Sequence, residues 1–133
     1  MTSIQSDKQT IHKPLSEVFT FLANANNHQA LMPENVYNWS STEDECKFTI
    51  QNMAKLELKF SEKNPDGKIT IVPSAPTAFD LNIVWTIESV DANTSAVQMT
   101  INADLNPFIK MMAMGPLGKL VNHQAQKLKE ILA

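Results

Sequence analysis

Apolar and polar residues alternate with a period of two over most of the stretch from residue 36 to residue 105. Such alternation is typical of β-strands that bury one face, because successive side chains point to opposite sides. Short polar turns separate the runs, residues 64–67 being the strongest, and predict antiparallel neighbours. The apolar positions predicted to face inward are Phe48, Ile50, Leu56, Leu58, Phe60, Ile69, Ile71, Phe79, Leu81, Ile83, Trp85, Val97, Met99 and Ile101. This shared apolar face needs another element to cover it.

The cover is predicted at the end of the chain. From Phe108 to about Leu132, apolar residues recur every three or four positions, the period of a helix. Asn106 and Pro107 are suitable residues for its start. A helix of about 25 residues would be about 37 Å long, enough to cross a small sheet. Pro116 lacks a backbone N–H, so we expect a kink or break beside it.

The segment before residue 36 contributes a weak strand pattern and two short helices. Residues 2–12 are predicted to form a strand, and Pro14 opens a helix that contains Val18 and Leu22. A second short helix is expected over residues 28–32, closed by a proline. The prediction is one α+β domain over residues 1–133: a curved antiparallel sheet of about seven strands around a long C-terminal helix.

Composition narrows the range of partners. The chain carries 11 Lys against 14 Asp and Glu, has no arginine, and has a net charge of −3, so nucleic-acid binding is disfavoured. No stretch approaches the roughly 20 apolar residues of a membrane span, and the N-terminus has no signal-peptide pattern. The single cysteine, Cys46, suits a reducing compartment, so a cytoplasmic protein is expected. Both a monomer and a homo-oligomer agree with the sequence.

Three short stretches resemble the START-like, or SRPBCC, superfamily, whose fold is the helix grip. Residues 11–19 read apolar-x-x-Pro-x-x-Glu-Val-aromatic, residues 28–33 form a short helix ending in proline, and residues 104–108 join the last strand to the long helix. The superfamily includes the major birch pollen allergen, polyketide cyclases and coenzyme Q-binding proteins. These motifs indicate the fold rather than the chemistry.

The resemblance implies a cavity between the concave face of the sheet and the long helix. Its apolar lining would select a ligand by shape and buried area. The candidate ligand-binding residues are Tyr37, Trp39, Phe48, Ile50, Leu58, Phe60, Ile71, Phe79, Leu81, Ile83, Trp85, Met99, Met112, Leu117, Val121 and Gln124. The alternative is that these residues simply fill a solid core.

No catalytic or metal-binding motif appears in the sequence. The histidines at positions 12, 28 and 123 are far apart and have no partner at metal-ligand spacing, and no cofactor is expected. Acid–base chemistry inside a cavity would depend on His123, Tyr37 and Glu34. The methionines at 111, 112 and 114 would form either an adaptable cavity mouth or the filling of an irregular gap.

Three functions follow from these observations. The preferred one is non-catalytic binding of an apolar small molecule, such as a lipid, polyketide or quinone-like compound. The second is an enzyme of the polyketide cyclase or dehydratase type. The third is a protein-interaction module that uses the methionine-rich start of the long helix.

Overall fold

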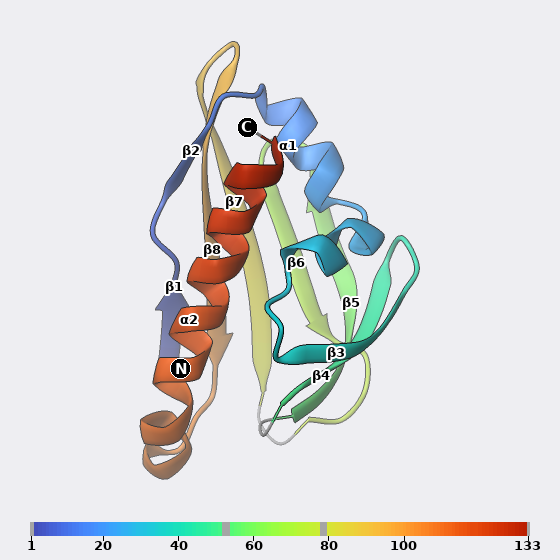
Figure 1. Ribbon diagram of the computed structural model, residues 1–133, viewed down its shortest axis with the longest axis vertical. Coiled ribbons are helices and arrows are strands. Elements are labelled where there is room, and N and C mark those ends of the chain that lie inside the picture. The colour runs from blue at the N-terminus through green and yellow to red at the C-terminus, as the bar shows by residue number, and fades with distance from the viewer. Residues whose placement is uncertain (1, 52–53, 78–79, 133) are drawn as a thin grey trace.

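A computed structural model describes residues 2–51, 54–77 and 80–132 and has the predicted α+β architecture (Figure 1). The strands form one antiparallel sheet in the order β1-β8-β7-β6-β5-β4-β3, and β2 also pairs with β8. The strands are β1 (Thr2–Gln5), β2 (Gln9–Ile11), β3 (Val36–Ser41), β4 (Glu45–Ile50), β5 (Ala54–Asn64), β6 (Lys68–Pro73), β7 (Leu81–Asp91) and β8 (Thr94–Ala103). The helices are α1 (Leu15–Leu22), the 3₁₀-helix η1 (Ala25–Leu31) and α2 (Pro107–Leu132).

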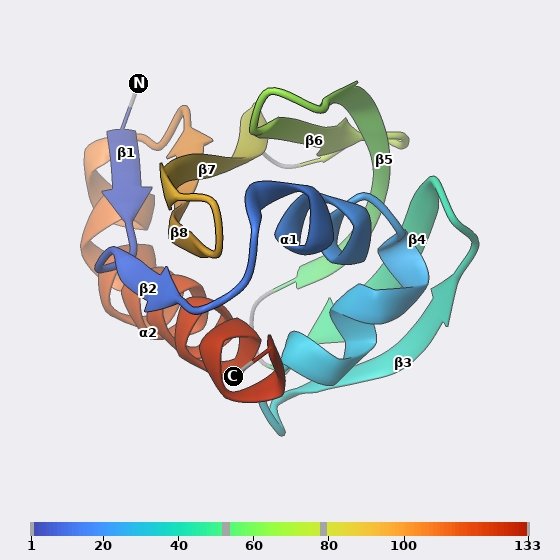
Figure 2. The same cartoon turned by 90° about the horizontal axis from the view of Figure 1, so that it is seen from above.

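The sheet curves around the helices. Seen from above, the strands form an arc, and the helices lie on its inner side (Figure 2). α2 packs against β8, β1, β2 and η1, while α1 packs against β7 and β8. The C-terminal half of α2 is tightly embedded, since Val121, Ala125 and Leu128 have no exposed surface. The long helix therefore covers the concave face of the sheet, as its apolar stripe predicts.

The first strand segment differs from the prediction, because residues 2–12 form two strands. Both β1 and β2 pair with β8, but one extra residue separates their registers. Ser6 lies at this interruption, where its N–H donates to the Met99 carbonyl and its hydroxyl accepts from the Met99 N–H. The side chain thus replaces a backbone partner, and the interruption leaves Ser6 buried and satisfied.

The expected break near Pro116 is wrong. α2 continues from Pro107 to Leu132 through Gly115 and Pro116 (Figure 1). Pro116 cannot donate a hydrogen bond to the Met112 carbonyl one turn earlier. Met112, Gly115 and Pro116 are all exposed, so water can satisfy that carbonyl.

Candidate ligand cavity

A cavity of about 60 Å³ lies between the concave face of the sheet and α2. A water molecule needs roughly 10–15 Å³, whereas drug-sized ligands occupy pockets of about 300–1,000 Å³. The space therefore exceeds one water molecule but is much smaller than a drug-sized pocket. A larger ligand would have to displace lining side chains.

The lining comes mainly from the inward positions of the sheet. The strands contribute Trp39, Cys46, Phe48, Ile50, Leu56, Leu58, Phe60, Ile71, Leu81, Ile83, Trp85, Met99 and Ile101, and the helical side contributes His28, Met32, Leu117, Leu120 and Gln124. Most residues proposed from the sequence are in this set, because strand parity decides which side chains point inward. Phe79, another of those candidates, lies outside the described residues.

Tyr37 does not line the cavity, although Trp39 does. A bulge in β3 separates them: Tyr37 pairs with Thr49 and Ser40 pairs with Lys47, so two residues lie opposite Phe48. The extra residue is Asn38, whose φ of 57° is left-handed, a conformation that asparagine tolerates. The bulge reverses the parity, leaving Tyr37 47% exposed while Trp39 stacks on Phe48 with ring centroids 5.3 Å apart.

Two further candidates lie elsewhere on α2. Met112 is 63% exposed and faces away from the sheet. Val121 is fully buried, but it packs in the core and is not part of the cavity lining. The stripe on α2 that meets the cavity is instead formed by Leu117, Leu120 and Gln124.

His28 is the polar lining residue that the sequence did not single out. In η1 the buried residues are Ala25, His28 and Leu31, which recur every three positions, as the three residues per turn of a 3₁₀-helix require. That spacing was the signal that could have placed His28 inside. The helix predicted there begins only at residue 28, so it does not include Ala25, the first residue of this pattern.

The environment of His28 holds its ring neutral. Its Nε2 lies 2.8 Å from the Leu22 carbonyl, which can only accept, so Nε2 carries the proton and Nδ1 is an acceptor. Burial lowers the pKa of His28 to about 4, outweighing the opposing effect of this hydrogen bond. The ring makes edge contacts with Phe60 and Trp85, at centroid distances of 5.2 and 6.2 Å.

The remaining polar groups of the lining are also neutral. Burial raises the pKa of the Cys46 thiol to about 12, so it stays protonated and is a poor nucleophile. Gln124 is 3% exposed, and within the described residues its amide makes no hydrogen bond. The Trp85 Nε1–H is buried and has no acceptor among residues 2–51, 54–77 and 80–132. Among the described lining residues, none is Lys, Asp or Glu.

The acid–base candidates proposed from the sequence lie outside this cavity. Glu34, Tyr37 and His123 are exposed. His123 borders an outer groove, together with Pro33, Asn35, Gly115, Pro116, Lys119 and Leu120. Leu120 is shared by the groove and the cavity, so its side chain forms the wall between the two.

The methionine-rich start of α2 is a surface feature. Phe108, Met111 and Met112 are 67%, 76% and 63% exposed, and none of them lines the cavity. These side chains therefore neither fill a gap in the core nor form the cavity wall. Their exposure is what the interaction-module hypothesis requires.

No protein-family model and no curated protein sequence matches the chain. Solved structures with the same fold include the protein XoxI from Bacillus cereus, with a TM-score of 0.78 and 11% identity, covering 99% of this chain and 96% of that one. The KanY protein has a TM-score of 0.78 and 10% identity, covering 98% and 97% of the two chains. The di-domain ARO/CYC protein BexL, from the BE-7585A biosynthetic pathway, has a TM-score of 0.69 and 15% identity, covering 98% of this chain and 46% of its own.

These similarities establish the fold, which is of the helix-grip kind: a curved antiparallel sheet with a long C-terminal helix. At 10–15% identity, these similarities do not indicate a shared function. Among the described helices, none is both long and apolar enough to cross a membrane. In the described part of the chain, no three His, Cys, Asp or Glu side chains are grouped to hold a metal ion.

Proposed function

We propose that this protein reversibly binds an apolar small molecule in the cavity between the sheet and α2, without catalysis. The observation that carries the proposal is an apolar cavity inside a core whose other parts are closely packed. Protein interiors contain few voids larger than a water molecule, because each void sacrifices packing contacts. A retained cavity lined by large apolar side chains is therefore a reasonable binding site.

The small volume is compatible with a larger guest. Met32, Met99, Leu117 and Leu120 line the cavity, and methionine in particular adopts many shapes at low cost. Leu120 separates the cavity from the outer groove, which offers a short route to solvent. We expect ligand entry through this wall. A cytoplasmic location, inferred from the single cysteine, remains part of the proposal.

Native mass spectrometry of the purified protein tests the proposal by detecting a co-purified small molecule. Thermal unfolding with benzene provides an independent test, because a ligand at a hundredfold excess over its Kd adds about 2.7 kcal/mol of stability. Leu117→Phe should fill the cavity and abolish the stabilisation. Met112→Phe introduces the same ring at an exposed site and should retain the stabilisation by benzene. If neither method detects binding by the unmodified protein, the proposal fails.

A cyclase-type enzyme is the second candidate, favoured by the shared fold with BexL and by the His28 ring in the cavity. With a pKa near 4, His28 is a weak base at neutral pH, which makes binding the preferred function. Turnover of a linear polyketide thioester, followed by mass spectrometry, distinguishes the two. Conversion that disappears in His28→Gln would establish catalysis in place of simple binding.

A further inference from the structure

The buried indole of Trp85 carries a donor that no described residue uses. Trp85 has no exposed surface, and no described residue accepts from its Nε1–H. Buried polar groups almost always have a partner, because losing water without replacement is costly. A buried donor without a partner among the described residues, on a residue that lines a cavity, is therefore available to a ligand.

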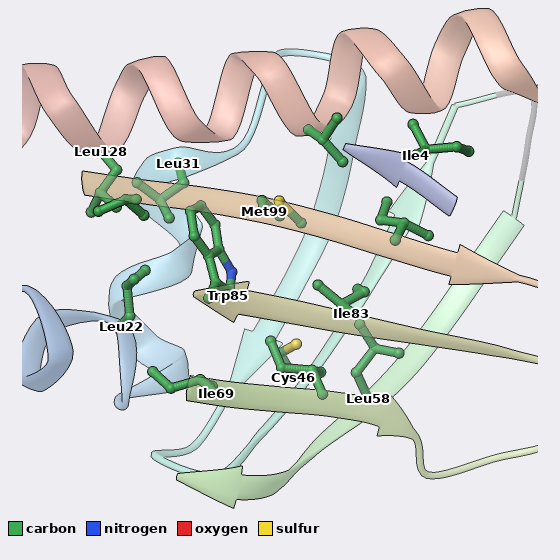
Figure 3. Packing of buried hydrophobic residues seen from close by; sticks show 14 of the residues in the cluster. Ile4, Leu22, Leu31, Cys46, Leu58, Ile69, Ile83, Trp85, Met99 and Leu128 are labelled. Atoms are coloured by element: carbon green, nitrogen blue, oxygen red, sulfur yellow. The ribbon is translucent and has the colours of Figure 1, made fainter. Parts of the chain in front are cut away.

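The indole nitrogen lies on the side of Trp85 that is nearer to another cavity-lining residue, Ile83 (Figure 3). In Figure 3 the Nε1 atom lies on the edge of the Trp85 ring nearer Ile83, on the side away from Leu22 and Leu128. Ile83 is a cavity-lining residue, whereas Leu22 and Leu128 belong to the closely packed core. Because the Trp85 side chain has no exposed surface, a ligand would reach this N–H by displacing a neighbouring lining side chain.

The His28 ring, which contacts Trp85 edge to face, carries an acceptor that no described residue uses. The His28 Nε2–H is committed to the Leu22 carbonyl, so Nδ1 retains a lone pair that no described residue uses. The two rings meet edge to face, with centroids 6.2 Å apart and planes at 79°. A hydroxyl group is the small neutral group that both accepts and donates a hydrogen bond. Gln124, a buried lining residue of α2, adds a third polar group.

The same surroundings exclude an anionic ligand. The lining residues that the structure describes include no Lys, and the one histidine among them is neutral. A carboxylate placed there would be buried without a counter-charge, which is strongly unfavourable. A fully apolar molecule would leave the Trp85 donor unpaired.

We infer that the ligand is a neutral apolar molecule carrying a hydroxyl group, which accepts from the Trp85 Nε1–H and donates to His28 Nδ1. This inference rests on the proposed function, and it adds a chemical class: alcohols or phenols in preference to hydrocarbons and carboxylates. Selection arises because only the hydroxyl pairs the groups that the fold leaves unpaired.

Benzene, phenol and benzoate form a matched set of small probes for a cavity of about 60 Å³. We expect phenol to bind about tenfold more tightly than benzene, the effect of one net hydrogen bond, and benzoate not to bind. Titrations followed by ¹H–¹⁵N NMR supply both the affinities and the indole signals. Phenol should shift the Trp85 Nε1–H resonance in the direction of a stronger hydrogen bond, and benzene should not.

The second tryptophan of the lining supplies the matched control. The Trp39 Nε1–H already donates to the Ser41 hydroxyl at 2.9 Å, so it is not available to a ligand. Trp85→Phe should therefore remove the preference for phenol over benzene. Because Trp39 also lines the cavity, Trp39→Phe can change both affinities, but it should keep their ratio. If Trp85→Phe does not fold, the shift of the Trp85 Nε1–H resonance in the unmodified protein still tests whether phenol binds this group.

The outcomes separate the two proposals. If none of the three probes binds, the proposed function fails. If benzene binds as tightly as phenol, or if benzoate binds best, the cavity is a binding site but the assigned ligand class is wrong. Equal loss of the preference in Trp85→Phe and Trp39→Phe would also overturn the role of Trp85.

Discussion

The two halves of α2 face the same sheet, but they are packed differently. At the packed end, the side chains of Leu22, Leu31, Val97 and Leu128 are all fully buried. Figure 3 shows Leu22, Leu31 and Leu128 in this region. At the cavity end, formed around Phe48, Ile83, Leu117 and Leu120, the apolar faces of sheet and helix leave a void. Both ends are equally apolar, so hydrophobicity does not explain the difference.

A third layer, formed by the two short helices, explains why the two ends are packed differently. α1 and η1 lie beside the C-terminal half of α2 and do not extend along its N-terminal half (Figure 1). Leu22 and Leu31, which fill the packed end, belong to these two short helices. At the cavity end, η1 contributes only His28, with Met32 directly after it, and the strands and α2 supply the rest of the wall. An apolar face must therefore be covered by another element, and the neighbouring elements determine how completely side chains fill the space between them.

Truncating one leucine at each end of α2 gives the largest expected contrast. Leu128→Ala should lower the free energy of unfolding by about 3–5 kcal/mol, because it empties a closely packed site. Leu117→Ala should cost about 2 kcal/mol or less, since that side chain already borders a void and has fewer contacts to lose. Denaturant unfolding of both variants measures the difference. Equal losses would mean that the two ends are packed alike.

Acid should destabilise the protein through His28, which lies where the two ends meet. Its pKa is about 4 in the folded chain against an ordinary 6.5, so the unfolded chain binds more protons between these values. Stability should fall as pH drops from about 6.5 to 4, by roughly 3 kcal/mol from this group.

The free energy of unfolding, measured from pH 7 to pH 4 for the unmodified protein and two histidine variants, tests this expectation. His28→Gln cannot titrate and should lose much of the slope. His123→Gln, which removes an exposed histidine, should behave like the unmodified protein. A His28→Gln variant with an unchanged slope would contradict the expected effect of burial.

Larger side chains at positions 117 and 121 of α2 compare the cavity end with the packed core at neighbouring turns of the helix. Val121→Phe should cost about 1–3 kcal/mol, because Val121 is fully buried away from the cavity. Leu117→Phe should cost less than about 1.5 kcal/mol, because the ring can extend into the void. Thermal unfolding ranks the two variants. If Leu117→Phe is the more damaging, the cavity end cannot accept added volume.

The smallest effect is expected at the exposed start of α2. Met111→Ser should change the free energy of unfolding by no more than about 0.5 kcal/mol, since Met111 is 76% exposed. Sedimentation of the unmodified protein should be measured alongside. A larger loss of stability, together with a dimer that becomes a monomer in Met111→Ser, would mean that a second copy covers this surface.

Periodicity was sufficient for most of the fold and for the wall of the cavity. The period-two runs predicted that Phe48, Ile83 and Trp85 share one face, because strand geometry alone imposes that alternation. The same rule failed at Tyr37, where the left-handed Asn38 adds one residue and reverses the sides. A bulge depends on pairing with a neighbouring strand, so one strand's sequence does not disclose it.

What the sequence by itself determined was which elements form, in what order, and which faces must be buried. These are local consequences of backbone geometry and of the cost of exposing apolar surface. Only the tertiary structure decided that a void remains beside Leu117, that His28 lines it, and that the Trp85 N–H has no acceptor among the described residues. Each of these depends on how side chains from several distant segments fit together in space, and no single segment encodes that fit.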